Sequence, residues 1–462
     1  MRLTARVPRI FALALVAAAF ALLFTLTAAS ADTIETDEPR ELIEDPLGIT
    51  FVVRVRAAAG LESAELIYKL LNPDGDVGGS GKGTFTPGVE TDVTFLLETQ
   101  TFERFIPIGS TFVYHWELVD SEGDRFSTPE REFTFLDGRF NWFQLTRTGV
   151  TVYWYGDNES KAMTALDVTR ESMENISQLL ETAVPYTVKV IVYGSGADGA
   201  LAQRSRGVLD QYIDTQGQRV APDLLLIYEP NPDVIRHEAA HIVTHVAGDG
   251  PFTSLPSWID EGVAVFAQST LSGGYRSAIE FGVSTDTTLS LREMGAPPNR
   301  AGLVNLFYGQ SYSVVQFLID EYGQQQLAEA FRVHYAGSRI DGALLEVYGF
   351  DQNGLYNIWR QANGLRPVTL VAPPTATTSP AAVATRAPIA LPGATATGGD
   401  GGNAAAAEAT ATSDPETGEP AASDDRGSGS SAGIVIAVVT LLAVLALGGG
   451  AVALLRRESR AN

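Results

Sequence analysis

The sequence of 462 residues contains no cysteine. Disulfides therefore cannot stabilise the fold, and no thiol is available as a zinc ligand or as a catalytic nucleophile. Stability must come from the burial of apolar side chains, for which a chain of this length is ample. Histidine is scarce as well: the chain has five, so a pair of them four residues apart is informative.

Positive charge is also under-represented, because 32 lysines and arginines stand against 55 aspartates and glutamates, a net charge of −23. Nucleic acids and anionic lipid surfaces are bound through cationic side chains, so this balance argues against both as partners. We interpret the acidity as that of a well-solvated surface.

Two apolar runs stand near the ends of the chain. Residues 1–31 begin with arginines, continue through an apolar run and end in Ala29-Ser30-Ala31, which is typical of a secretory signal peptide. Residues 433–455 carry no charge and are long enough for one transmembrane helix. Residues 456–462 add three arginines, which predict a cytoplasmic tail. We therefore expect a single-pass protein of the cell membrane, with an extracellular ectodomain and a cytoplasmic C-terminus.

The composition between these ends changes along the chain. Residues 45–140 contain short alternating apolar runs separated by turn signals such as Asn72-Pro73-Asp74-Gly75, which predict an all-β sandwich. This part resembles immunoglobulin or fibronectin type III modules. Two roles stay open for it: it could recognise a partner, or it could act as a spacer domain. Residues 367–431 are rich in Ala, Thr, Pro, Gly and Ser, which predicts a disordered stalk.

The segment His237-Glu238-Ala239-Ala240-His241 predicts a metal site. On a helix of about 3.6 residues per turn the two histidines share one face and can offer two imidazole nitrogens to one ion. Glu238 lies one position round the helix, where its carboxylate can reach a water molecule on the metal. Asn231 and Pro232 suit the start of this helix, and Gly248 suits its end.

A catalytic zinc site needs a third protein ligand, and two arrangements compete for it. A metzincin has glycine at the position of Thr244 and histidine at the position of Ala247, so that arrangement fails. A gluzincin takes a glutamate from a second helix, and Glu261 follows His241 by 20 residues. A helix, a short connection and an antiparallel second helix fit this spacing.

Three residues around Glu261 complete the expectation for the second helix. We expect Ser257 to cap it, with Asp260 reaching back to the cap. Glycine is unfavourable inside a helix, so we expect Gly262 to allow close approach of the two ligand helices.

The HExxH pattern followed by P-x-W-x-x-E-G-x-A, here Pro256 to Ala264, resembles the gluzincin zinc peptidases of clan MA, and most closely the peptidase-MA-like domains of bacterial surface proteins. The resemblance covers residues 150–365 and implies an α+β, thermolysin-like domain that binds Zn²⁺. It implies that His237, His241 and Glu261 are the metal ligands and that Glu238 is the general base. The expected function is that of a membrane-anchored extracellular zinc metalloprotease, an endopeptidase that cleaves peptide or protein substrates with a metal-activated water.

Further along, the segment from Tyr308 to Leu318 resembles the tyrosine-bearing helix of the aminopeptidase branch, whose tyrosine hydrogen-bonds the developing oxyanion. The resemblance implies this role for Tyr308, with Tyr312, one turn later, as the reserve candidate. Packing is the alternative role for both rings. The resemblance also implies that residues 223–229 form an edge strand, to which the substrate backbone adds.

Two other functions stay open. An aminopeptidase is less supported, because no Gly-x-Met-Glu-Asn segment, which grips a free amine in that branch, occurs upstream of the motif. A surface binding or adhesion protein would carry the peptidase-like domain in a catalytically vestigial form, although the intact HExxH motif and Glu261 argue against it. We expect His245 to support the site or the core rather than to bind the metal. His115 and His334 have no predicted function.

Overall fold

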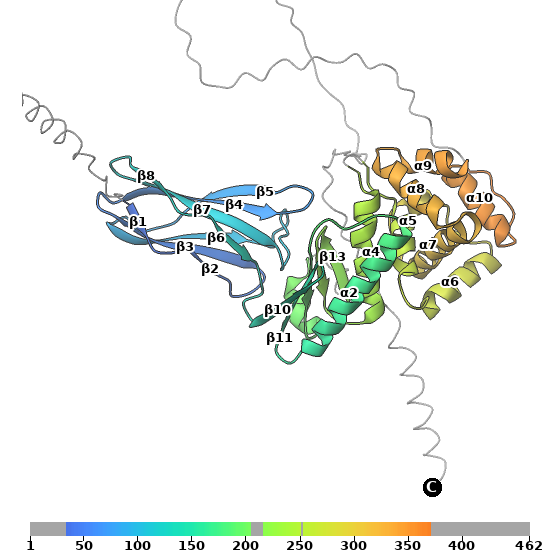
Figure 1. The fold of residues 1–462 in the computed structure, drawn as a ribbon, viewed down its shortest axis with the longest axis horizontal. Coiled ribbons are helices and arrows are strands. Elements are labelled where there is room, and N and C mark those ends of the chain that lie inside the picture. Colours follow the sequence, from blue (N-terminus) through green and yellow to red (C-terminus); the bar gives the residue numbers. More distant parts are fainter. Residues whose placement is uncertain (1–33, 205–215, 251–252, 371–462) are drawn as a thin grey trace, which may run out of the picture. The chain divides into compact units, whose positions relative to one another are not determined.

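The computed structural model describes residues 34–204, 216–250 and 253–370. The predicted signal peptide, transmembrane helix and cytoplasmic tail, and nearly all of the predicted stalk, lie outside these residues. Among the described residues, no helix combines the length and the apolar character that crossing a bilayer requires. Along the chain, strands come first, a mixed sheet follows, and helices complete the described part (Figure 1).

Residues 34–134 form two antiparallel sheets that share one core. In the first sheet β3 lies between β1 and β2 and also pairs with β6; its strands are β1 (Ile34–Thr36), β2 (Arg40–Leu42), β3 (Gly48–Ala57) and β6 (Glu90–Glu98). The second sheet has the order β5-β4-β7-β8, with β9 paired to β7; its strands are β4 (Leu61–Leu71), β5 (Val77–Lys82), β7 (Thr111–Asp120), β8 (Arg125–Ser127) and β9 (Arg131–Thr134).

The core of this sandwich follows from the alternation seen in the sequence. Phe112, Tyr114, Trp116 and Leu118 of β7 are each at most 1% exposed, because every second residue of a strand points to the same face. The two sheets therefore bury one aromatic-rich core, as the alternating pattern predicts. The first strands, β1 and β2, lie before residue 45, where the sandwich was expected to begin. The sequence did not predict them because each has three residues and is too short to show an alternation.

A mixed sheet follows, with the order β10-β11-β12-β14-β13. Its strands are β10 (Trp142–Arg147), β11 (Val150–Tyr155), β12 (Val188–Val192), β13 (Gly217–Ala221) and β14 (Leu224–Ile227). The three central strands are parallel, and β10 and β13 are antiparallel to their neighbours. Helix α2 (Glu159–Leu179) connects β11 to β12, and the short α3 (Gly196–Gly199) and η1 (Ala200–Ala202) follow β12. β10 lies before residue 150, where the predicted peptidase domain begins.

Both faces of the mixed sheet are covered, and this cover positions the site. Leu225 and Ile227 of β14 pack with residues of α2 and α4 (Pro232–Gly248). On the opposite face, Leu224, Leu226 and Tyr228 belong to the same hydrophobic core as the sandwich. All of β14 is therefore buried, as expected of a parallel strand with two covered faces. The sandwich thus shares a hydrophobic core with this sheet. A domain that acted only as a spacer would not need such a core.

The remaining described residues are helical, and α5 is their centre. The helices are α5 (Ser257–Phe266), α6 (Gly273–Ser284), η3 (Glu293–Gly295), α7 (Ala301–Tyr322), α8 (Gln324–Tyr335), α9 (Ile340–Tyr348) and α10 (Gln352–Ala362). Helix α5 contacts both α4 and α7, and Trp258, Ile259 and Val263 of α5 are fully buried. Because α5 is buried against α4, residues carried by these two helices can meet.

Candidate metal centre

Helix α4 carries both histidines of the motif. The helix begins at Pro232, and the Asn231 side chain caps it by accepting a hydrogen bond from the N–H of Asp233, as the sequence predicts. His237 and His241 lie one turn apart with their Nε2 atoms 3.2 Å from each other. Their side chains are 0% and 3% exposed, so both nitrogens point into the protein interior.

Helix α5 brings Glu261 to the same point. Glu261 is fully buried, and its Oε2 lies 3.1 Å from His237 Nε2 and 3.5 Å from His241 Nε2. One ligand atom from each of the three residues therefore forms a small triangle that can hold a metal ion. We call His237, His241 and Glu261 the ligand triangle.

The dimensions and chemistry of the ligand triangle fit zinc. In a tetrahedral site with bonds of about 2.05 Å, neighbouring ligand atoms stand about 3.3 Å apart; the three separations here are 3.1, 3.2 and 3.5 Å. Neither Glu261 oxygen forms a hydrogen bond of acceptable geometry within the described residues, although both are buried. A buried carboxylate without a partner is costly unless a cation pairs with it. Two imidazoles and one carboxylate are a donor set that zinc accepts.

The outer ring nitrogen of each histidine in the triangle contacts a side chain to which the sequence analysis gave no role at the metal site. Asp260 Oδ1 lies 2.9 Å from His241 Nδ1, and the Gln268 amide nitrogen Nε2 lies 3.1 Å from His237 Nδ1. Acceptors at this position fix the ring and leave its Nε2 lone pair for a metal. For Gln268 this requires its amide oxygen to face the ring, and an amide flip exchanges oxygen and nitrogen.

Asp260 is charged in this position despite its burial. Burial alone would raise the pKa of Asp260, but the charge and hydrogen bond of the His241 ring outweigh burial and hold that pKa below its usual range. A charged acceptor strengthens the hydrogen bond to His241. Asp260 therefore fixes the His241 ring of the ligand triangle.

The expected cap of α5 is wrong. Pro256 rather than Ser257 occupies the N-cap position, and no side-chain hydrogen bond caps the helix. Asp260 turns toward α4 instead, where it also accepts a hydrogen bond from Thr244. Adjacent residues on a helix point about 100° apart, so a carboxylate next to Glu261 can reach the outer side of a neighbouring ligand. The position of Asp260 directly before Glu261 was therefore the signal in the sequence for this contact with His241.

Glu238 lies beside the triangle and is held by the mixed sheet. It is fully buried, and its Oε2 accepts a hydrogen bond from the N–H of Arg219 in β13 at 2.9 Å. Its Oε1 has no hydrogen-bond partner within the described residues. Burial raises the pKa of Glu238, against the opposing effect of both rings and of the Arg219 N–H. A carboxylate with a raised pKa and one unengaged oxygen is suited to accept and return a proton.

The edge strand beside Glu238 differs from the predicted one. Residues 223–229 were expected at the edge, but β14 is an inner strand, and β13 is the outer strand next to it in the described sheet. The continuous apolar run of β14 marks a strand with two covered faces. β13 reads Gly-Gln-Arg-Val-Ala, which has no alternation of apolar and polar residues, and the sequence analysis missed it for that reason.

Gly262 has a different packing partner from the expected one. A Cβ added at Gly262 would lie 2.5 Å from Val315 Cγ2 and 2.6 Å from the Ser311 carbonyl oxygen, both in α7. The glycine therefore allows α5 to approach α7 rather than α4. The expectation of a close approach is right, and its partner is corrected.

We expect Gly262→Ala to lower the free energy of unfolding by about 1–3 kcal/mol, because the added methyl group forces α5 and α7 apart. Urea denaturation measures this difference. Gly302→Ala in α7 is the matched control, since nothing lies within 4 Å of the added Cβ. That control should be neutral or stabilising by up to about 1 kcal/mol. Equal stabilities of the two variants would contradict this role of Gly262.

The structure separates the two candidate tyrosines. Tyr308 is 2% exposed, and its ring centroid lies 6.2 Å from that of His237 and 5.3 Å from that of Tyr275. Burial, followed by the negative charge of Glu261, raises the pKa of Tyr308 well above its usual value, so its hydroxyl stays protonated. The Tyr312 hydroxyl donates to Gln316 of its own helix. Tyr308 is therefore the tyrosine that lies next to the ligand triangle.

The other three histidines contact different parts of the protein. His245 Nδ1 lies 2.8 Å from Asp249, and its Nε2 lies 3.0 Å from Asp74 of the sandwich. His334 Nδ1 lies 2.8 Å from the Gly248 carbonyl oxygen, and His115 lies in β7. The ligand triangle contains none of these three residues.

Comparison with known proteins gives one family and several weak structural likenesses. Residues 229–363 match the family model of the peptidase MA superfamily. No curated protein matches the chain. An M1 zinc metallopeptidase from Deinococcus radiodurans is similar with a TM-score of 0.34 and 10% identity, over 74% of this chain and 94% of that one. The third fibronectin III domain of a human protein is similar with a TM-score of 0.16 and 13% identity, over 24% of this chain and 91% of that one. At these TM-scores the structural likenesses carry no argument about function.

Proposed function

We propose, from the match of residues 229–363 to the peptidase MA superfamily, that the protein is a zinc metallopeptidase with Glu238 as its general base. The observation that carries the proposal is the ligand triangle, with separations of 3.1 to 3.5 Å, beside a buried glutamate with one unengaged oxygen. A scaffold that only bound other proteins would gain nothing from burying these carboxylates, which costs free energy of folding.

The residues around the triangle have separate tasks in this proposal. A zinc ion held by the triangle would supply Lewis acidity and lower the pKa of a water molecule to about 7. Glu238 accepts a proton from the attacking water and returns it to the leaving amine. The protonated Tyr308 hydroxyl donates a hydrogen bond to the oxyanion that forms on the substrate carbonyl. A donor of this kind contributes about 3–4 kcal/mol to transition-state stabilisation.

The outer edge of β13 provides a place for the substrate backbone. An extended peptide can add to a free strand edge through main-chain hydrogen bonds. β13 passes directly beside the general base, since the Arg219 N–H contacts Glu238. We infer that the substrates are extended segments of peptides or proteins, cleaved as by an endopeptidase.

We also propose that the enzyme acts outside the cell and is anchored in the membrane. The sequences of residues 1–31 and 433–455 support this location, as a signal peptide and as an uncharged apolar run followed by arginines. Deletion of residues 433–462 should release the protein into the medium, which fractionation and immunoblotting measure. Retention of the shortened protein in the membrane fraction would contradict the anchor.

The experiment that tests the function combines metal analysis with hydrolysis of an unstructured protein by the full-length chain. We expect about one zinc ion per chain, cleavage that a chelator abolishes, and recovery of cleavage when zinc is added back. A zinc-loaded protein without cleavage would favour the binding protein with a vestigial domain. A protein that binds no zinc would overturn the proposal.

A further inference from the structure

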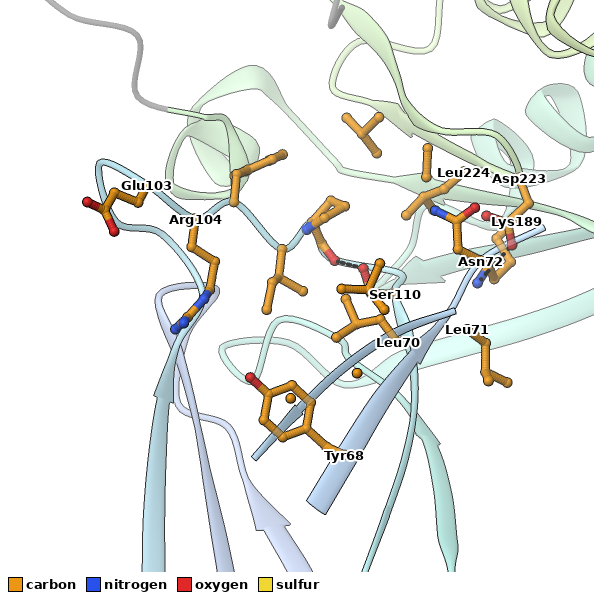
Figure 2. A pocket seen from close by; sticks show the side chains of 18 of the residues that line it. Tyr68, Leu70, Leu71, Asn72, Glu103, Arg104, Ser110, Lys189, Asp223 and Leu224 are labelled. Atoms are coloured by element: carbon orange, nitrogen blue, oxygen red, sulfur yellow. Dashed lines mark hydrogen bonds and ion pairs between the residues drawn. The ribbon is translucent and has the colours of Figure 1, made fainter. Parts of the chain in front are cut away.

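A pocket of about 610 Å³ opens where the sandwich meets the mixed sheet (Figure 2). Ligand pockets commonly have volumes of about 300–1,000 Å³. One wall comes from β4, β5 and the loop 103–107 of the sandwich. The other comes from β12, the end of β13, the start of β14 and the turn between these two strands. The ligand triangle and Glu238 do not line it, so it is separate from the metal site.

β13 connects the general base to this pocket. The Arg219 N–H lies 2.9 Å from Glu238 Oε2, and the next two residues, Val220 and Ala221, line the pocket. A strand advances about 3.3 Å per residue, so the pocket begins within about 7 Å of the amide that holds Glu238. The pairing of β13 with β14 shifts between Arg219 and Ala221, and such irregularities redirect the side chains that follow them.

The opposite wall presents a second strand edge. β5 is an outer strand of its described sheet, and its sequence is Val-Gly-Gly-Ser-Gly-Lys. Gly79 packs against Tyr68 so closely that an added Cβ would lie 2.5 Å from the ring, whereas nothing lies nearer than 3.9 Å to a Cβ added at Gly78. Glycine leaves the main chain of β5 open to a backbone that passes along it.

The lining favours an apolar side chain. Leu71 and Val77 line the pocket and are 36% and 59% exposed, so they have apolar surface left to bury. The charges of the lining residues sum to zero. Lys189 forms an ion pair with Asp223 at 3.1 Å, and Glu103 and Arg104 add one negative and one positive charge. With these charges balanced, apolar contact decides which side chain binds.

Contacts between the two walls make the pocket preformed. Lys189 Nζ donates to Thr111 Oγ1 of β7 at 3.0 Å, and Gln100 Nε2 donates to the Leu201 carbonyl oxygen at 2.7 Å. Gly109 of the sandwich packs so closely that an added Cβ would lie 2.5 Å from Leu224 Cδ1. A preformed pocket lowers the entropy cost of binding a peptide.

We propose that the sandwich forms part of the substrate-binding site, and that this pocket receives an apolar side chain of an extended peptide about two to four residues from the scissile bond. The inference rests on the proposed peptidase function, because the path of the peptide along β13 starts at Glu238. It names the substrate class as extended segments with one aliphatic or aromatic side chain at that position. Peptides too short to reach the pocket lose its binding energy, which lowers kcat/KM.

The experiment uses the full-length, zinc-loaded protein with Glu238→Gln, so that peptides bind without being cleaved. Labelled peptides each carry one leucine at a different distance from the scissile bond, and fluorescence anisotropy gives their Kd. We expect one leucine position to bind at least about tenfold more tightly than the others. Adding Leu71→Asp and Val77→Asp should remove this preference and create a preference for lysine at the same position.

The matched control carries Val89→Asp and Leu96→Asp, two exposed apolar residues of the sandwich that do not line the pocket. It should keep the leucine preference. An unchanged preference in the Leu71/Val77 variant, or an equal loss in both variants, overturns the role of the pocket. Cleavage assays of the parent protein separate the two proposals. Cleavage with a leucine preference that the Leu71/Val77 variant keeps removes the pocket alone. A leucine preference without cleavage removes the peptidase function and leaves the pocket as a peptide-binding site.

Discussion

Glu238→Gln should retain zinc and lose peptide hydrolysis by about 10²- to 10⁴-fold. The amide keeps the shape of the carboxylate and can still accept the hydrogen bond that the Arg219 N–H donates at 2.9 Å. It cannot accept a proton from the attacking water. Glu238 does not belong to the ligand triangle, so its replacement leaves the ligand atoms in place. Steady-state cleavage of a peptide, together with metal analysis of the same sample, measures both quantities.

Glu280→Gln in α6 is the control, because it makes the same chemical change at an exposed position. Its activity should equal that of the unmodified protein. Full activity of Glu238→Gln would remove Glu238 as the base. Loss of zinc from that variant would instead indicate that the carboxylate helps to hold the metal.

Glu261→Ala should weaken zinc binding more than Asp260→Asn does. In other metal sites, removal of a residue that hydrogen-bonds a metal ligand lowers the metal affinity by about 10- to 100-fold. The substitution removes one of three ligands, whereas Asp260→Asn leaves all three and weakens only the hold on His241. Zinc content after dialysis, and the Kd from competition with a coloured chelator, measure the difference. Equal zinc affinity of Glu261→Ala and the parent protein would remove Glu261 as a ligand.

The stability of the zinc-free protein gives an independent check of the same residue. Both oxygens of Glu261 are buried at the centre of the ligand triangle, and an ion that binds only the folded protein stabilises it against unfolding. Glu261→Ala should therefore abolish the rise in Tm that zinc produces in the parent protein. A zinc concentration of 100 times Kd stabilises a protein by about 2.7 kcal/mol, which thermal unfolding detects.

The motif helix could be predicted from the sequence because its signals are local. Asn231, Pro232 and Gly248 mark its ends, and the structure places α4 at Pro232–Gly248. The spacing of His237 and His241 likewise follows from helical geometry alone. The convergence of Glu261 needed the family pattern in addition, since a separation of 20 residues fits many connections. The predicted relation to clan MA is confirmed by the family match over residues 229–363.

The features that the sequence analysis missed depend on contacts between distant segments. The partner of Gly262 is α7, about 50 residues further along the chain. Asp260 reads as a helix-start residue until the neighbouring α4 places His241 beside it. β13 has five residues and no alternation, so its existence follows only from its pairing with β14. Local patterns predict elements, and the neighbours of those elements decide what each side chain does.

The grip on Glu238 comes from a peptide N–H, and every amino acid except proline supplies one. The orientation of the Glu238 carboxylate by this hydrogen bond is therefore insensitive to which side chain other than proline stands at position 219. Under the proposed function, substitutions along β13 change the side chains beside the substrate while the hydrogen bond that holds Glu238 is kept. Arg219→Pro is the substitution that would remove this hydrogen bond to Glu238, because proline has no backbone N–H.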